Sequence, residues 1–264
     1  GPSGGRGRRR RVPPPDAPTQ GPVRPTLVGA PGIEGLGPGG AIRRPACHDG
    51  GVPSGQRHHH HRSRSGTPEE SASIPEAPEL PPNYPVEWEA DVVLRDGSVA
   101  HVRPITPADA VRLREFHAGQ SEESIYLRFF APLRELSDRD VQRFTVVDYE
   151  SRVALVATHL DALLGIGRYD LIDDTTAEVA FNVSDAAQGK GVGSMLLEHL
   201  ALVGYDAGVT RFVAEVLPQN RRMLNVFKEA GYAVHHRLED GVVTLNFDIT
   251  PTAASTAVRI AREH

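Results

Sequence analysis

The sequence predicts an α/β domain whose central sheet is mixed, mostly antiparallel, and covered by helices on both faces. Three β-rich runs follow one another over residues 152–160, 164–172 and 176–183, which is the pattern of an antiparallel meander. A glycine-rich turn then leads into a helical pattern, and a strand, a helix and a last pair of strands follow. Strands alternating with helices over the second half are typical of a sheet that carries helices on its faces.

Asp-Gly pairs indicate two β-hairpins, because this pair supplies the positive φ angles of a tight two-residue turn. The first predicted hairpin spans residues 91–103 and turns at residues 96–97. The second spans residues 232–249 and turns at residues 240–241. These hairpins add strands at the beginning and at the end of the domain.

Capping residues and apolar periodicity indicate where helices begin. Thr106, Ser121 and Ser137 each precede a run with apolar residues at helical spacing, and their hydroxyl groups can accept from the first free N–H groups. The expected helices cover residues 106–117, 121–132, 137–144, 189–207 and 221–230.

The first 80 residues differ in composition from the rest of the chain. They contain 15 glycines and 14 prolines, so 29 of these 80 positions disfavour regular structure. A Pro and Gly content above roughly 25–30% without a period is typical of disordered, low-complexity sequence. We therefore expect a disordered Gly/Pro/Arg-rich arm over residues 1–80, a folded domain over 84–249, and a tail or linker over 250–264.

The charge changes at the same boundary. Residues 1–80 carry 11 arginines and 7 acidic residues, a net charge of +4, whereas the remainder carries 18 basic and 27 acidic residues, a net charge of −9. An acidic domain argues against a nucleic-acid surface and is compatible with a cationic partner.

The single cysteine, Cys47, excludes an internal disulfide and a cysteine-based metal site in this sequence. No apolar run approaches the roughly 20 residues that a bilayer-spanning helix needs. Prolines, and not an apolar core, follow the arginines of residues 6–11, so no signal peptide is indicated. We expect a cytoplasmic protein with no membrane partner and no metal.

The strongest local signal is a glycine-rich run between a predicted strand and a predicted helix. It reads Gln188-Gly189-Lys190-Gly191-Val192-Gly193-Ser194. Three glycines at alternate positions leave no Cβ atoms to keep a phosphate away, and the free N–H groups of a first helical turn attract anions. The run predicts a phosphate-binding cradle.

Two common nucleotide-binding motifs fit the run poorly. A P-loop ends in Gly-Lys-Ser/Thr, whereas Gly191 follows Lys190 here, and the dinucleotide fingerprint needs a glycine where this chain has Ser194. A glycine-rich loop that only lets a helix pack closely on a strand stays open as the structural alternative.

The run instead resembles the (Gln/Arg)-x-x-Gly-x-(Gly/Ala) motif of the GNAT superfamily of acetyl-CoA-dependent N-acetyltransferases. Gln188, Gly191 and Gly193 occupy the defining positions. Residues 220–223 resemble the start of the family's second cofactor-contacting helix, and residues 231–232 resemble the pair that ends it. The resemblance covers nearly all of residues 90–249 and implies the GNAT fold.

The resemblance also implies how acetyl-CoA, the expected cosubstrate, is held. In GNAT enzymes the fourth and fifth strands splay apart around the pantetheine arm, and the amides of the glycine-rich run hold the pyrophosphate. The implied cofactor-binding residues are Phe181, Asn182, Val183, Gln188, Gly189, Lys190, Gly191, Val192, Gly193, Ser194, Asn220 and Phe227. Many members have a tyrosine in place of Phe227 that protonates the leaving thiolate, so water, Tyr232 or another hydroxyl would have to do so here.

Glu178 is the predicted catalytic residue. Side-chain alternation places it on the same strand face as Ala180 and Asn182. A lysine amine has a pKa near 10.4, so it arrives protonated and cannot attack a thioester until a base removes the proton. We expect Glu178 to be that base, directly or through water, with Glu215 on the neighbouring strand as the second candidate. The alternative is that Glu178 is an ordinary solvent-facing strand residue.

A closer resemblance exists to the GNAT domain of bacterial protein lysine acetyltransferases of the Pat type, which acylate an active-site lysine of acyl-CoA synthetases. Residues 94–98, 102–105, 124–130 and 177–181 carry it. We therefore expect transfer of an acetyl group to a protein lysine, with an acyl-CoA synthetase as the candidate partner. Two alternatives stay open: a small-molecule amine acetyltransferase, and a non-catalytic acyl-CoA-binding regulatory module, for which Phe227 is the only indication.

Overall fold

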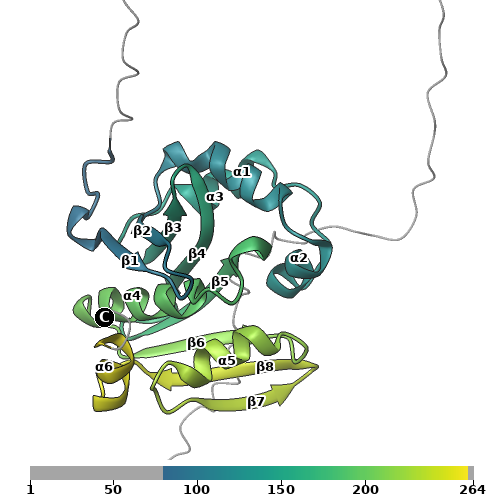
Figure 1. Ribbon diagram of the computed structural model, residues 1–264. Coiled ribbons are helices and arrows are strands. Elements are labelled where there is room, and N and C mark those ends of the chain that lie inside the picture. The colour runs from purple at the N-terminus through teal and green to yellow at the C-terminus, as the bar shows by residue number, and fades with distance from the viewer. Residues whose placement is uncertain (1–79, 261–264) are drawn as a thin grey trace, which may run out of the picture.

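The computed structural model describes residues 80–260, which form one sheet covered by helices (Figure 1). The arm predicted over residues 1–80, including Cys47, lies outside the described residues except for its last residue. Within the described range, no helix combines the length and the apolar character needed to cross a bilayer.

The first part of the fold is the predicted hairpin followed by three short helices. Its elements in chain order are the 3-10 turn η1 (Val86–Trp88), β1 (Ala90–Val93), β2 (Val99–Pro104), the 3-10 turn η2 (Pro107–Asp109), α1 (Ala110–Ala118), α2 (Glu122–Phe129) and α3 (Asp138–Thr145). Two of the predicted caps are present. The Ser121 hydroxyl accepts from the Ser124 N–H, and the Ser137 hydroxyl accepts from the Asp140 N–H.

The second part contains the predicted meander and the alternating helices and strands. Its elements are β3 (Arg152–His159), β4 (Ala162–Leu171), β5 (Thr176–Val183), the 3-10 turn η3 (Asp185–Ala187), α4 (Val192–Asp206), β6 (Arg211–Val216), α5 (Arg221–Glu229), β7 (His235–Glu239), β8 (Val242–Asp248) and α6 (Ala253–Ile260).

Helix α4 begins three residues later than the helix predicted from residue 189. Gly189 and Gly191 have φ angles of +80° and +92°, in the left-handed region, and this conformation cannot continue a right-handed helix. The glycine-rich run is therefore a separate loop that ends where the helix starts at Val192.

The strands form one sheet in the order β1-β2-β3-β4-β5-β6-β8-β7. Neighbouring strands are antiparallel except β5 and β6, which are parallel. Helix α4 makes the crossover that a parallel pair requires. The predicted fold class, a mixed and mostly antiparallel sheet with helices on both faces, is confirmed.

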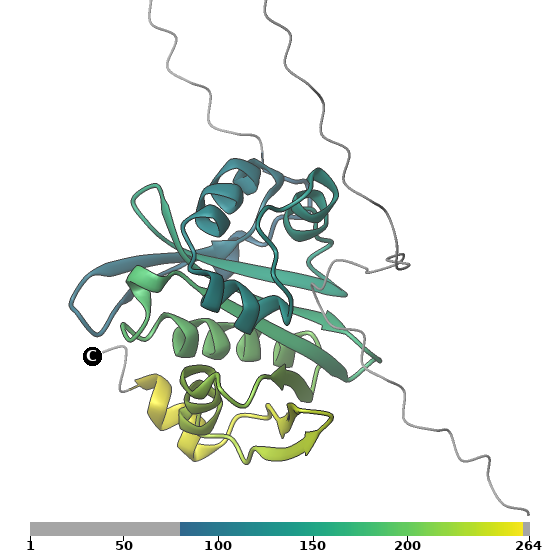
Figure 2. The ribbon, with the colours of Figure 1, turned by 90° about the vertical axis from the view of Figure 1, so that its right-hand side faces the viewer.

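Helices α1, α2 and α3 lie on one side of the sheet, and α4 lies on the other (Figures 1 and 2). Two glycines of β4 let α4 approach closely. A Cβ atom at Gly165 would lie 2.8 Å from a Val192 methyl carbon, and one at Gly167 would lie 2.9 Å from a Leu200 methyl carbon. Larger residues at either position would push the helix off the sheet, together with the loop that precedes it.

Helix α6 falls in the segment predicted as a tail or linker. The Thr252 hydroxyl donates to the Gly231 carbonyl at 3.1 Å, and a Cβ atom at Gly231 would lie 2.7 Å from the Ser255 nitrogen. The first part of this segment is therefore packed against the end of α5.

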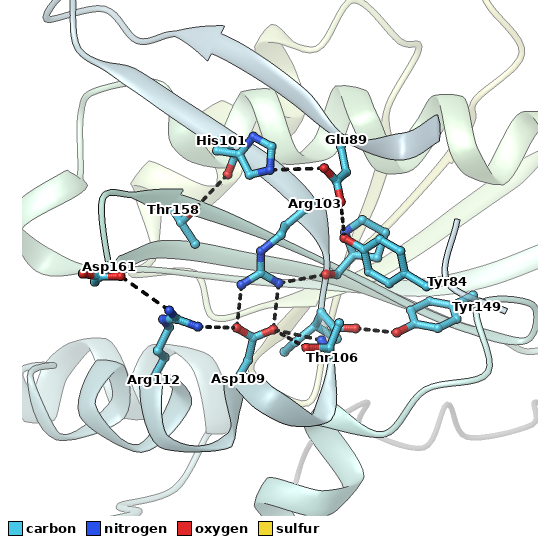
Figure 3. A network of polar contacts seen from close by, with 12 residues as sticks. Tyr84, Glu89, His101, Arg103, Thr106, Asp109, Arg112, Tyr149, Thr158 and Asp161 are labelled. Atoms are coloured by element: carbon cyan, nitrogen blue, oxygen red, sulfur yellow. Dashed lines mark hydrogen bonds and ion pairs between the residues drawn. The ribbon is translucent and has the colours of Figure 1, made fainter. Parts of the chain in front are cut away.

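A buried ion pair joins β2 to the start of α1 (Figure 3). Arg103 donates to both carboxylate oxygens of Asp109, at 2.8 and 2.6 Å, and the Asp109 side chain is fully buried. The Thr106 N–H also donates to this carboxylate, at 2.9 Å. Burial alone would raise the pKa of Asp109, but the hydrogen bonds from Arg103 and Thr106 outweigh it and hold the pKa below its ordinary value.

We predict that Asp109→Asn lowers the free energy of unfolding by about 3–5 kcal/mol, because it leaves the Arg103 charge without its partner. Urea denaturation at neutral pH measures this loss. A carboxyl group whose pKa is lowered by folding stabilises the fold above its unfolded-state pKa, and this contribution disappears as the pH falls. The difference between wild type and variant should therefore shrink in acid.

Asp161→Asn is the matched control. Asp161 is an exposed partner of Arg112 at 3.5 Å, so its loss should leave stability nearly unchanged. If the two variants were equally stable, the buried pair would contribute nothing beyond the exposed one.

Candidate active site

Strands β5 and β6 pair at three positions and then separate. The last pair in register is Glu178 with Val213, although β5 continues to Val183 and β6 to Val216. Beyond that pair, β5 stays bonded to β4, and β6 stays bonded to β8. Each strand therefore presents an open backbone edge to the other across a crevice.

Side chains from two helices line this crevice together with residues 179–181 of β5 and 214–216 of β6. Leu127 and Arg128 come from α2, and Asn220, Met223 and Phe227 come from α5. The crevice is thus bordered by helices from both sides of the sheet. This is the arrangement that the family resemblance implied for the pantetheine arm.

The glycine-rich loop lies at the end of β5, where the crevice opens. A Cβ atom at Gly193 would lie 3.6 Å from a Val183 methyl carbon and 3.4 Å from a Val226 methyl carbon, so the first turn of α4 sits between β5 and α5. Within the described part of the chain, the N–H groups of residues 191–194 donate to no backbone or side-chain acceptor. Unpaired N–H groups at a helix start favour an anion at this point.

Gln188 supports the loop through its side chain. Its amide nitrogen donates to the Asp185 carboxylate at 2.9 Å and to the Ser124 hydroxyl at 3.2 Å, and its amide oxygen accepts from Arg222. These contacts connect the loop to α2 and α5. The side chain of the motif's first residue therefore fixes the loop in place, and a contact to a ligand would have to come from its backbone.

Lys190 is held by an acidic partner on another element. Its ammonium lies 3.0 Å from the Asp96 carboxylate at the turn of the β1–β2 hairpin. The Lys190 carbonyl also accepts from the Arg95 N–H, at 3.1 Å. The hairpin turn thus touches the cradle directly.

Glu178 occupies the apex of the crevice, at the last paired position of β5. Only 5% of the residue is exposed, so it is not the solvent-facing residue of the alternative interpretation. Its neighbours in register are Asp170 on β4 and Val213 on β6.

A half-buried arginine, Arg128, lies near Glu178. Burial lowers the pKa of Arg128 to about 10, the charge of Arg168 acts in the same direction, and the charge of Glu178 opposes both. Arg168 is itself buried, with its guanidinium 3.6 Å from Asp170. Glu178 therefore belongs to a group of charges of alternating sign, in which Glu178 and Arg168 are buried and Arg128 and Asp170 are half-buried.

Glu215 lines the crevice two residues beyond the apex on β6. Burial raises its pKa above the ordinary glutamate value. Side-chain alternation places Glu215 on the same face of β6 as Val213, the partner of Glu178. Both predicted carboxylates are thus brought to one face of the sheet at the point where the strands separate.

The residues predicted on α5 reach the crevice from the opposite side. The Asn220 side chain accepts from the Met223 N–H at 3.1 Å and caps the helix, and Phe227 is buried with its ring edge-on to Phe181 at 5.9 Å between centroids. Tyr232 lines a different cavity and stacks on Phe247. The structure therefore gives Tyr232 no place beside the crevice.

The end of β5 is contacted by the segment between α1 and α2. Gln120, which follows α1, donates to the Asn182 side chain at 2.9 Å and to the Val183 carbonyl at 3.4 Å. Phe181, Asn182 and Val183 form the end of β5, which is no longer paired with β6. The predicted set thus lies around one crevice and its mouth, although the side chains of Asn182, Gln188 and Asn220 already have protein partners.

Sequence reasoning missed Arg128. The signal was a charge inside a helix whose buried positions are Ile125 and Phe129, since a charged residue beside such positions usually has a specific partner. It also missed Arg95, for which the local sequence contains no signal. Among the described residues, no group of three His, Cys, Asp or Glu side chains is arranged to hold a metal ion.

Comparison with known proteins agrees with this geometry. Residues 119–232 match the model of the acetyltransferase (GNAT) family. The crystal structure of the GNAT domain of S. lividans PAT is 52% identical in sequence, with a TM-score of 0.60, and the match covers 62% of this chain and 99% of that one.

Two curated relatives are also similar. The acetyltransferase Pat of Mycolicibacterium smegmatis is 33% identical over 164 residues, and an acetyltransferase of Pseudomonas aeruginosa is 27% identical over 158 residues. These matches cover 61% and 58% of this chain. The match spans 49% of the first relative, about half its length, and 85% of the second. With the fold and the crevice described above, these similarities establish that the chain belongs to the acetyltransferase (GNAT) family.

Proposed function

We propose that the domain over residues 84–249 transfers an acetyl or another short acyl group from acyl-CoA to the side-chain amine of a protein lysine. The observation that carries this proposal is the row of unpaired N–H groups over residues 191–194 at the mouth of the crevice between β5 and β6. Together they offer an anion site and an extended slot to a single ligand.

Acyl-CoA fits this combination in its chemistry. Its pyrophosphate is an anion that suits the free N–H groups at the start of α4. Its pantetheine arm carries amides that suit the open edges of β5 and β6. When bound, acyl-CoA supplies a thioester, whose carbonyl carbon is open to attack by an amine.

Glu178 is the proposed base. It takes a proton from the lysine ammonium, directly or through water, so that the neutral nitrogen can attack the thioester carbonyl. The tetrahedral intermediate then releases the CoA thiolate, and the nitrogen loses its second proton. Arg128 lies close enough to Glu178 for the two opposite charges to attract each other. The raised pKa of Glu215 makes it the second candidate.

The leaving thiolate needs a proton, and Phe227 cannot give one. The buried Phe227 ring packs against Phe181 and Phe247, which is a core-packing role. Because Tyr232 lines another cavity, we assign the proton to water at the crevice.

Protein lysine is the proposed acceptor for two reasons. The described domain belongs to the acidic part of the chain, which suits a basic surface. Two relatives also carry the name Pat, which supports a shared acceptor class. An acyl-CoA synthetase is the proposed protein partner, and a cytoplasmic location the proposed setting. Acetyl transfer from acetyl-CoA to such a synthetase, measured beside free polyamines and aminoglycosides, tests this choice. Faster transfer to the small amines would favour the small-molecule alternative.

We expect Gly191→Asp to abolish CoA binding, as measured by calorimetry. The new side chain would add bulk and negative charge at the cradle. A Cβ atom at Gly191 would already lie 3.4 Å from Arg95 Cγ. Gly208→Asp is the matched control, because Gly208 has φ +90° against +92° at Gly191 and a Cβ there would meet nothing within 4 Å. Equal CoA affinity in the two variants would remove the basis of the cradle assignment.

Glu178→Gln should keep CoA affinity but lower turnover by roughly 10²–10⁴-fold, the usual contribution of general-base catalysis. The loss should shrink as the pH rises toward the lysine pKa, because solvent then deprotonates the amine. Steady-state rates from pH 7 to 10 measure this profile.

Glu215→Gln is the control for this experiment and should matter less. If turnover collapsed in Glu215→Gln and stayed near wild type in Glu178→Gln, Glu215 would be the general base. If neither change mattered and the wild type acylated no protein or small amine, the non-catalytic binding module would be the better account.

A further inference from the structure

We propose that Arg95, at the turn of the β1–β2 hairpin, binds the pyrophosphate of CoA beside Gly191. The inference rests on the proposed function and adds to it a binding residue outside residues 119–232, the part of the chain that matches the family model. It makes the N-terminal hairpin a part of the cofactor site.

The Arg95 side chain lies against the cradle. A Cβ atom placed on Gly191 would be 3.4 Å from Arg95 Cγ and 3.5 Å from Arg95 Nε, so the guanidinium begins next to the glycine that precedes α4. The Arg95 N–H donates to the Lys190 carbonyl at 3.1 Å. Backbone and side chain of one residue therefore both contact the loop whose N–H groups are unpaired.

The turn that carries Arg95 is held in place by a second contact. Lys190 reaches back to Asp96 at 3.0 Å, and Asp96 accepts from the Ser98 hydroxyl at 2.6 Å. The turn is therefore bonded to the glycine-rich loop through two consecutive residues, Arg95 and Asp96. A side chain on such a support needs little reorganisation to meet a ligand.

Arg95 is also the cation at the cradle that is least engaged elsewhere. Lys190 is paired with Asp96, and Arg222 donates to Gln188. The Arg95 guanidinium has Glu229 at 3.9 Å, with both side chains more than half exposed. Exposed pairs of this length contribute little, so a phosphate can replace Glu229 at small cost.

The geometry favours the pyrophosphate over the 3′-phosphate. The free N–H groups at the start of α4 and the Arg95 guanidinium both border Gly191, so one anion can meet both. An arginine can also donate two hydrogen bonds to one phosphate group, which makes such contacts strong and directional.

Calorimetric titration of the full chain with CoA and with dephospho-CoA tests the proposal. Arg95→Ala should weaken both ligands by a similar factor, roughly 10- to 100-fold for a lost charge-assisted contact. Arg237→Ala is the matched control, because Arg237 is an exposed arginine on β7 that is paired with Glu239 at 2.9 Å. This variant should bind both ligands with wild-type affinity.

Arg95→Met separates charge from packing. Methionine keeps an unbranched stem at Gly191 but carries no charge, so it should lose as much affinity as Arg95→Ala if the guanidinium binds phosphate. Wild-type affinity in Arg95→Met with a loss in Arg95→Ala would show that the stem only packs on the loop, and would overturn the proposal.

Two other results would also overturn it. A loss seen with CoA and absent with dephospho-CoA would assign Arg95 to the 3′-phosphate. Unchanged affinity in every Arg95 variant would remove Arg95 from the site and leave the proposed function intact. If the wild type itself bound neither ligand, the proposed function would fail, and the Arg95 assignment with it.

Discussion

The parting of β5 from β6 determines where everything else in the site lies. These strands are the parallel pair of an otherwise antiparallel sheet, and their pairing ends at Glu178 and Val213. Leu127 from α2 and Met223 and Phe227 from α5 line the crevice that this separation leaves. The open backbone edges follow directly from the separation, because in a closed sheet they would bond to each other.

The same separation explains why charge can be buried at the apex. Glu178 lies near Arg128 of α2 and across from Asp170, with Arg168 completing the group. Buried charges are costly unless they are paired, and the alternation of signs meets that requirement. The arrangement places a buried carboxylate beside arginine side chains at the point where the strands separate, a setting that a solvent-facing strand residue would not have.

Local features of the sequence predicted much of this fold. The caps at Ser121 and Ser137, the turn at residues 240–241 and the three strands of the meander rest on interactions within a few residues, and they appear where they were expected. The start of α4 was placed too early, since apolar periodicity does not register the positive φ angles of Gly189 and Gly191.

Local features of the sequence could not predict the long-range contacts of the site. Periodicity showed which face of its strand Glu178 occupies, but not that Arg128 would lie beside it. The contact of Arg95 with residues 190 and 191 joins positions almost a hundred residues apart, and only the register of β1 through β5 brings them together. Likewise, Arg103 gives no sign in the sequence that Asp109 will be its buried partner.

Hydrogen exchange measured with and without CoA tests the central claim most directly, because it reports on backbone N–H groups one segment at a time. The account predicts slower exchange at residues 189–194 and along the open edges at residues 179–183 and 214–216. Exchange in α3, none of whose residues line the crevice, should not change. Protection confined to other segments, with residues 189–194 unaffected by saturating CoA, would contradict it.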